Sequence, residues 1–166
     1  MLAPPRSARP FRLVDVAGGT GDIAERVLRR GGSGTSAVLC DISPEMLDAA
    51  RSHIDDPRAE FIPGSEVSRE ADYTFVSGTF NVRANASTGE WGSYVKSKLA
   101  EIASRSRRGF AFNLLTSYVD WTKDDLFYAD PAEFFTFCRE ELSRYVTLIH
   151  DYPLFEWTIV VRTEVS

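Results

Sequence analysis

Hydrophobic and polar positions alternate between strand-like and helix-like spacing along most of the chain. Short apolar runs bounded by glycine, proline and polar turns predict strands, and apolar residues three and four apart predict helices. These patterns predict strands over residues 13–16, 36–42, 59–63, 72–80 and 109–115, and helices over 22–30, 44–54, 91–106 and 131–142. Strands that alternate with helices are typical of a parallel sheet covered by helices on both faces.

The end of the chain departs from this alternation. Residues 145–151 and 155–163 read as two strands joined only by Tyr-Pro-Leu, a link so short that the strands must pair antiparallel. The sequence therefore predicts an α/β fold with a mostly parallel, seven-stranded sheet that closes on a C-terminal antiparallel hairpin. We expect residues 1–11, which include three prolines, to be a flexible lead-in, and residues 12–166 to form one domain.

The segment 12–22, RLVDVAGGTGD, passes from a strand through a glycine-rich turn into a helix. Glycines permit positive φ angles and let a ligand approach the backbone, and the free N–H groups at a helix N-terminus suit an anionic group. The same segment also matches the dinucleotide pattern G-x-G-x-x-A, which would indicate NAD. Three features speak against NAD: Asp15 inside the strand, Asp22 after the last glycine and the terminal hairpin. Of these, the buried carboxylate of Asp15 suits a ligand with a cationic amine.

The pattern Asp15-x-Ala17-x-Gly19-x-Gly21 resembles the acid-x-small-x-Gly-x-Gly loop of the class I S-adenosylmethionine (SAM) methyltransferases. This resemblance implies a Rossmann-like fold, SAM as the cofactor and methyl transfer as the reaction. Asp41, twenty residues after the last glycine of the turn, fits a carboxylate that accepts hydrogen bonds from two ribose hydroxyls.

The expected cofactor-binding residues follow the first four strands, at the edge where the carboxyl ends of parallel strands meet. In the family this edge carries the nucleoside, and polar residues after the third strand approach the adenine amino group. The candidates are Asp15, Ala17, Gly18, Gly19, Thr20 and Gly21 in the turn, Asp41, Ile42 and Met46 after the second strand, Ser65 and Glu66 after the third, and Ser77 and Gly78 after the fourth.

The two halves of the chain resemble different groups within this family. VDVAGGTGDIAERV and CDISPEMLDAAR resemble the ubiquinone/menaquinone C-methyltransferases, whereas FNLLTSYVDWTKDDLFYADP and HDYPLFEWTIVV look like small bacterial class I methyltransferases of undefined substrate. The long N-terminal region of the quinone enzymes has no counterpart here. From this resemblance we therefore infer SAM as the cofactor, but not a quinone precursor as the substrate.

Residues 116–130, TSYVDWTKDDLFYAD, interleave aromatic and acidic side chains after the fifth predicted strand. Aromatic residues over an open crevice exclude water and shape a pocket, so we expect a functional loop here. A general base is needed only if the methyl acceptor must lose a proton. By position, the candidate catalytic residues are Tyr118 and Asp120 in this loop, and His150 and Asp151 at the end of the sixth predicted strand.

The amino-acid composition excludes several classes of protein but does not identify the substrate. The 166 residues are 43% hydrophobic and carry a formal net charge of −5, which argues against a nucleic acid as the main partner. No run approaches a transmembrane span, and no cluster of metal-ligating residues stands out. Cys40 and Cys138 read as buried thiols in a reducing compartment, so we expect a cytoplasmic protein.

The sequence thus favours a SAM-dependent methyltransferase that acts on a small-molecule or glycan-type acceptor. Three alternatives remain open: a quinone-precursor C-methyltransferase, an NAD-linked oxidoreductase and a non-catalytic SAM-binding module. The short N-terminal segment ahead of the first strand leaves room for the last of these. The acceptor atom and the oligomeric state are equally open.

Overall fold

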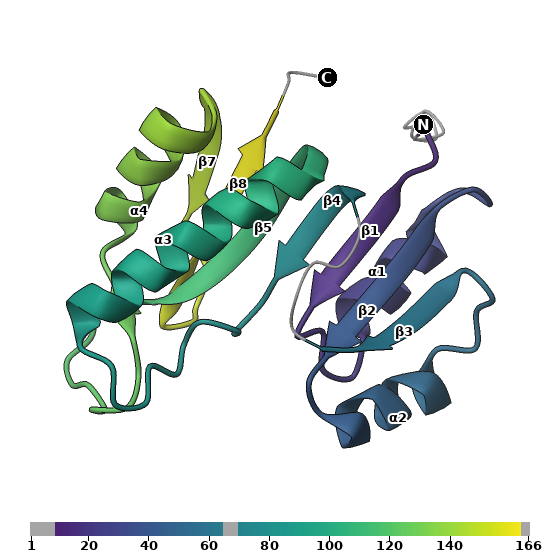
Figure 1. The fold of residues 1–166 in the computed structure, drawn as a ribbon, viewed down its shortest axis with the longest axis horizontal. Helices are drawn as coiled ribbons and strands as arrows, with labels where there is room; N and C mark the ends of the chain where they lie inside the picture. The colour runs from purple at the N-terminus through teal and green to yellow at the C-terminus, as the bar shows by residue number, and fades with distance from the viewer. Residues whose placement is uncertain (1–8, 65–69, 164–166) are drawn as a thin grey trace.

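A single twisted sheet runs through the protein, and the computed structural model describes it over residues 9–64 and 70–163 (Figure 1). The described strands follow the order β3-β2-β1-β4-β5-β8-β7, and β6 pairs with β5 off this path. The strands are β1 (Arg12–Val16), β2 (Ser36–Asp41), β3 (Ala59–Pro63), β4 (Ala71–Val76), β5 (Ser106–Thr116), β6 (Tyr128–Ala129), β7 (Tyr145–Ile149) and β8 (Glu156–Arg162). The helices are α1 (Asp22–Arg30), α2 (Pro44–His53), α3 (Thr88–Arg105), α4 (Pro131–Phe137) and the π-helix η1 (Cys138–Leu142).

The pairing of the strands confirms the predicted α/β architecture. Strands β1 to β5 run parallel to one another, and β8 lies antiparallel between β5 and β7. The predicted seven strands are therefore present, and β6 makes the described sheet eight-stranded. Two residues long, β6 lies inside the segment 116–130 that the sequence predicts to be all loop. It forms because the chain returns beside β5 at Leu115 and Thr116, beyond the last residue of β4 that pairs with β5.

Several element boundaries differ from the predicted ones for local reasons. Helix α3 begins three residues early because Ser87 and Glu90 form a capping box at its N-terminus. Strand β4 ends at Val76, four residues early, because Gly78 turns the chain with a φ of 69°. The helix predicted over 131–142 changes from α to π geometry at Cys138.

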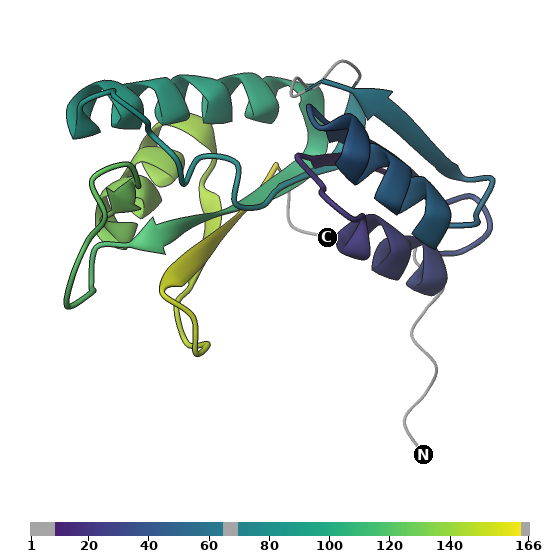
Figure 2. The same cartoon turned by 90° about the horizontal axis from the view of Figure 1, so that it is seen from below.

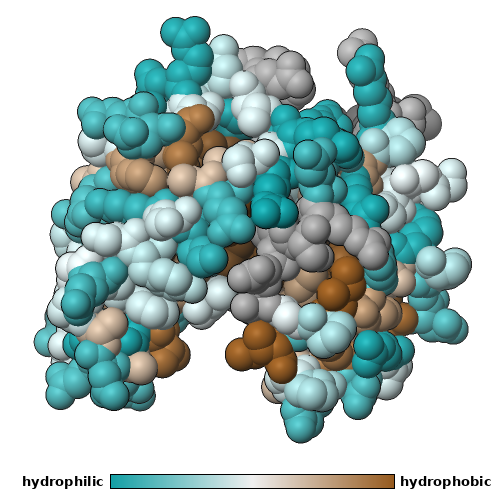
Figure 3. Space-filling view, viewed as in Figure 1, coloured by the Kyte–Doolittle hydropathy of each residue, from teal (hydrophilic) through white to brown (hydrophobic). Residues whose placement is uncertain are grey.

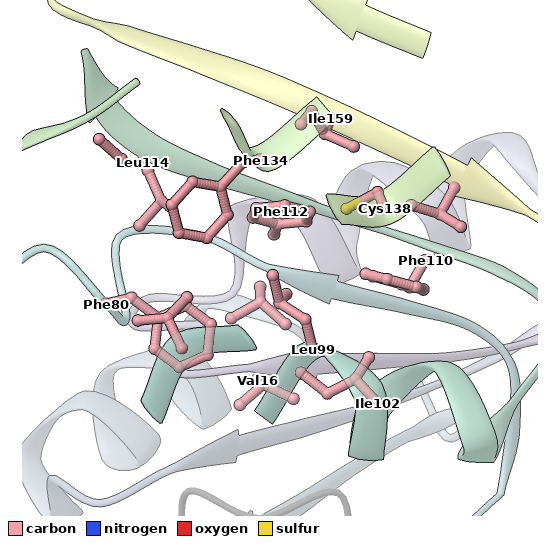
Figure 4. Packing of buried hydrophobic residues seen from close by; sticks show 14 of the residues in the cluster. Val16, Phe80, Leu99, Ile102, Phe110, Phe112, Leu114, Phe134, Cys138 and Ile159 are labelled. Atoms are coloured by element: carbon pink, nitrogen blue, oxygen red, sulfur yellow. The ribbon is translucent and has the colours of Figure 1, made fainter. Parts of the chain in front are cut away.

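Two hydrophobic clusters hold the helices against opposite faces of the sheet. Figure 2 shows α3 and α4 on one face and α1 and α2 on the other. The larger cluster packs Phe112 and Leu114 of β5 against Leu99 of α3 and Phe134 of α4 (Figure 4). The smaller cluster joins β1 and β2 to α1 and α2; its buried members are Leu13, Ala24, Leu28, Ala37, Leu39, Leu47, Ala50 and Ile54. Because both faces are covered around β1, strand β1 is almost wholly buried, as expected of a central parallel strand.

Gly109 allows β8 to approach β5 closely. Its φ is 151°, and a Cβ at this position would lie 2.3 Å from the backbone oxygen of Val161 on β8. A backbone oxygen cannot swing aside as a flexible side chain can, so any side chain here must push the two strands apart.

We expect Gly109→Ala to lower the free energy of unfolding by about 3 kcal/mol, because the substitution adds both steric overlap and backbone strain. Urea unfolding measures this loss. The matched control is Gly89→Ala in the first turn of α3, where a Cβ meets nothing within 4 Å and helix propensity favours alanine by up to about 1 kcal/mol. Equal losses in the two variants would contradict the close approach.

Candidate active site

The glycine-rich turn after β1 is held by its own backbone. The N–H of Gly21 donates to the carbonyl of Gly18 at 2.9 Å, and the N–H of Gly18 donates to the carbonyl of Cys40 at 3.2 Å. Gly19 and Gly21 take positive φ angles of 55° and 86°, and Ala17 joins them at 53°. The turn therefore needs residues that tolerate the left-handed region.

The glycines of this turn serve different purposes. A Cβ at Gly21 would lie 2.6 Å from Cδ1 of Ile54, so this glycine lets the turn pack against the end of α2. A Cβ at Gly19 would have no atom of the described residues within 4 Å, so none of these residues covers the backbone there. Open space over a bare backbone is what a ligand that rests on the turn requires.

Asp41 fastens the turn to the end of β2. Its side chain is 7% exposed, one carboxylate oxygen accepts the N–H of Gly19 at 3.0 Å, and the other accepts the N–H of Ser43 at 2.9 Å. Ser43 in turn caps α2 through the N–H of Met46. A carboxylate can accept about four hydrogen bonds, so each oxygen of Asp41 keeps room for a further donor.

Asp15 lies directly beneath the turn with its charge uncompensated. Only 1% of the residue is exposed, and neither carboxylate oxygen has a hydrogen-bond partner among the described residues. Burial raises the pKa of Asp15 to about 7. The backbone N–H of Ala24 lowers this pKa in part, although it does not meet hydrogen-bond geometry. The negative charges of Asp41 and Asp22 raise the pKa further. At neutral pH this carboxyl group therefore needs a proton or a cationic partner.

Apolar side chains stand at the mouth of the site beside Asp41. Ile42 is 74% exposed and Met46 is 44% exposed, although both are large hydrophobic residues. In Figure 3 the molecule is hollowed along its lower edge, between α2 and the loop after β4, with hydrophobic residues on both sides. Of the other candidates, Thr20 bonds to the side chain of Asp22, whereas Ser65 and Glu66 lie outside the described residues.

Asn113 is a residue of the site that sequence reasoning missed. Its side-chain oxygen accepts the N–H of Gly78 at 2.8 Å, and its amide nitrogen donates to the hydroxyl of Ser77 at 3.2 Å. Asn113 thus fixes the two candidate residues at the end of β4 from the neighbouring strand β5. The signal was present in the sequence GFAFNLL, because an amide within a buried apolar strand requires hydrogen-bond partners.

The segment between β5 and β6 is tied to the loop after β4. The N–H of Phe127 donates to the carbonyl of Asn81 at 2.8 Å, and the N–H of Arg83 donates to the carbonyl of Asp125 at 2.9 Å. Between these bonds, Val82 and Leu126 form an isolated antiparallel bridge. The two loops therefore form one connected structure over the carboxyl ends of β4 and β5.

The structure brings two of the four candidate catalytic residues into contact. The rings of Tyr118 and His150 stack at a centroid distance of 6.0 Å and an interplanar angle of 30°. Asp151 is exposed beside His150, and Asp120 lines a separate pocket. His150 and Asp151 follow strand β7, which is two strand spacings, or roughly 10 Å, from β5.

The described residues hold neither a cluster of metal ligands nor a membrane-spanning helix. Over residues 9–64 and 70–163, no three His, Cys, Asp or Glu side chains are placed to hold a metal ion. Within the same ranges, no helix combines the length and the apolar character needed to cross a membrane.

Comparison with known sequences agrees with this geometry. The family described as "Methyltransferase domain" matches residues 13–105. The Mycobacterium tuberculosis protein described as "Putative methyltransferase Rv1506c" is 42% identical over 159 residues, which cover 94% of this chain and 95% of that protein. The ubiquinone/menaquinone biosynthesis C-methyltransferase UbiE of Rhodopseudomonas palustris is 40% identical over 92 residues, which cover 49% of this chain but only 36% of UbiE.

Solved structures show the same fold. Magnesium protoporphyrin IX methyltransferase from Synechocystis, with S-adenosylhomocysteine (SAH) bound, superimposes with a TM-score of 0.72 over 93% of this chain and 75% of that one, at 10% identity. The CurJ carbon methyltransferase gives a TM-score of 0.70 over 98% of this chain and 50% of that one, at 14% identity. At such low identity these similarities concern the fold alone.

The buried charge of Asp15 predicts a pH-dependent stability. Because its folded pKa lies above the ordinary value of 3.8, the protonated carboxyl stabilises the ligand-free fold below about pH 4, and this stability is lost as the pH rises to about 7. The loss amounts to at most about 4 kcal/mol.

Urea unfolding at pH 5 and pH 8 measures this loss, and Asp15→Asn should remove it and be the more stable form at pH 8. Asp124→Asn, which changes an exposed acid in the loop after β5, should leave the dependence unchanged. An unchanged pH profile in Asp15→Asn would show that other groups cause it.

We expect Asn113→Ala to lower the free energy of unfolding by about 1–3 kcal/mol, because it leaves the N–H of Gly78 without its acceptor. It should also weaken SAH binding, since Ser77 and Gly78 lose their support. Ser77→Ala removes only the longer of the two bonds and should cost less in thermal unfolding. A smaller effect in Asn113→Ala than in Ser77→Ala would refute the positioning role.

Proposed function

The chain belongs to the methyltransferase domain family and is a class I SAM-dependent methyltransferase, and we propose that it methylates a small-molecule or glycan-type acceptor. The observation that carries the proposal is the pair of acids around the glycine turn. Asp41 retains acceptor capacity at the mouth, and Asp15 beneath the turn has no hydrogen-bond partner among the residues that the structure describes. We take residues 12–166 as the methyltransferase domain.

The residues around the turn fit SAM. The spare acceptor sites of Asp41 suit the two ribose hydroxyls, and the exposed side chains of Ile42 and Met46 suit the faces of an adenine. The unpartnered carboxylate of Asp15 suits the electrostatic field of an ammonium group. The open backbone at Gly19 leaves room for the chain that links the two ends of the cofactor.

When bound, SAM supplies a methyl carbon to which the acceptor's electron pair forms a bond, while the carbon–sulfur bond breaks and its electron pair returns to sulfur. The residues of this chain align the reactants and exclude water. Asn113 holds the Ser77–Gly78 corner, and the linked loops after β4 and β5 cover the crevice. If the acceptor atom carries a proton, the candidate bases are Asp120 and the stacked pair of Tyr118 and His150, with Asp151 beside them.

The alternatives carry less support. An NAD-linked oxidoreductase is inconsistent with the family to which the chain belongs. The similarity to UbiE is compatible with a quinone-precursor acceptor but covers only 36% of that enzyme, so it does not favour one. We further place the protein in the cytoplasm, because the buried Cys138 carries a free thiol, as is common in reducing compartments.

Calorimetric titration tests the cofactor residues. SAH should bind in the micromolar range and NAD should not bind. Asp41→Ala should weaken SAH binding at least about tenfold, because it removes the ribose acceptors and the support of Gly19. Asp48→Ala changes an exposed acid of α2 and should bind SAH normally. Equal SAH affinity in the Asp41 and Asp48 variants would refute the role of Asp41.

A further inference from the structure

An apolar pocket of about 190 Å³ opens between the end of β5 and the β7–β8 hairpin. Its lining residues include Leu115 of β5, Leu126, Tyr128 and Phe155 of the hairpin. Trp121 and Asp120 complete the rim. We refer to this space as the β5–hairpin pocket.

The β5–hairpin pocket begins where the proposed cofactor site ends. Asn113, which holds the Ser77–Gly78 corner, and Leu115, which lines the pocket, are two residues apart on β5 and point to the same face of the sheet. Two residues of a strand span roughly 7 Å. A ligand in the pocket would therefore lie beside the corner at which the cofactor is expected.

The walls of the pocket are held before any ligand arrives. The hydroxyl of Tyr128 accepts the N–H of Lys123 at 3.2 Å, and the N–H of Leu126 donates to the carbonyl of Lys123 at 3.2 Å. The bridge between Val82 and Leu126 ties the same wall to the loop after β4. A preformed wall lowers the entropic cost of binding.

The chemistry of the walls restricts the occupant. Trp121 and Phe155 are 68% and 73% exposed, so two aromatic side chains offer uncovered apolar surface at the rim. A cavity of about 150 Å³ with apolar walls accommodates benzene, and this pocket is slightly larger. A sugar ring of similar size carries hydroxyls on all sides, and those that face the apolar walls away from Asp120 and Lys123 would be buried without partners, which costs free energy for each one.

We propose that the β5–hairpin pocket binds the methyl acceptor, and that the acceptor presents a single planar, largely apolar ring to it. This inference rests on the proposed methyl transfer and selects the small-molecule class over the glycan class. The polar groups of the acceptor lie toward Asp120 and Lys123, and its ring lies between Leu126 and Phe155.

The test uses the SAH-saturated protein and two probes, p-cresol as the apolar ring and methyl α-D-glucopyranoside as the sugar. Saturation-transfer NMR titration measures their binding, and calorimetry measures SAH affinity on the same samples. We expect p-cresol to bind in the millimolar range, as fragments of this size do, and the sugar not to bind. Leu126→Trp fills the pocket and should weaken p-cresol binding about tenfold.

Leu154→Trp is the matched control, because Leu154 lies in the same hairpin, is 61% exposed and does not line the pocket. It should bind p-cresol normally. Trp121→Ala is a second variant that removes a rim residue from an exposed position and should also weaken p-cresol binding. All three variants should retain wild-type SAH affinity, which shows that they fold.

The outcomes separate this inference from the proposed function. Normal SAH binding without p-cresol binding, or with p-cresol binding unaffected by Leu126→Trp, would overturn the pocket assignment and leave the proposed function intact. Binding of the glucoside at the same site would overturn the apolar class. Absence of SAH binding would refute the proposed function, and with it the role of the pocket in methyl transfer.

Discussion

The carboxylate of Asp41 is the interaction on which the arrangement of the site depends. It joins three elements at once, because it accepts the N–H of Gly19 in the turn after β1 and the N–H of Ser43 at the start of α2, while its own backbone ends β2. Without it, two partly buried N–H groups would lose their acceptor, and only the bond from Gly18 to the carbonyl of Cys40 would still link the turn to β2. In the proposed function the same group also accepts the ribose hydroxyls, so one side chain would both support the turn and recognise the ligand.

A second polar contact, made from a strand three positions away in the sheet, supports the corner after β4. Asn113 of β5 reaches across to Ser77 and Gly78, so the corner after β4 is fixed from the side and not by its own turn alone. Between these two contacts lie the carboxyl ends of β1 and β4, which is where open α/β sheets bind their ligands. The loops beyond β4 and β5 are linked to each other by backbone bonds, so the acceptor side is built on an ordered scaffold.

The sequence was sufficient to predict the strand–turn–helix around the glycines, the alternating strands and the closing hairpin, because these depend on local residue patterns. It predicted Asp41 because the spacing from the glycine turn is a property of the chain. It did not predict β6, since two residues carry no periodicity and pair only because β5 extends beyond β4. It also missed the role of Asn113, whose partners lie more than thirty residues away in the sequence. Long-range contacts of this kind are decided by the register of β4 against β5.

Under the proposed role of Asp15, its uncompensated carboxylate would link the abundance of the enzyme to the supply of its methyl donor. A ligand that binds only the folded chain stabilises it by mass action, and a partner for a buried charge makes that effect larger. The chain without ligand spends more time unfolded, and proteases in a cell remove unfolded chains continuously. A cell that runs short of the donor would therefore hold fewer copies of the enzyme, as well as less substrate for each copy.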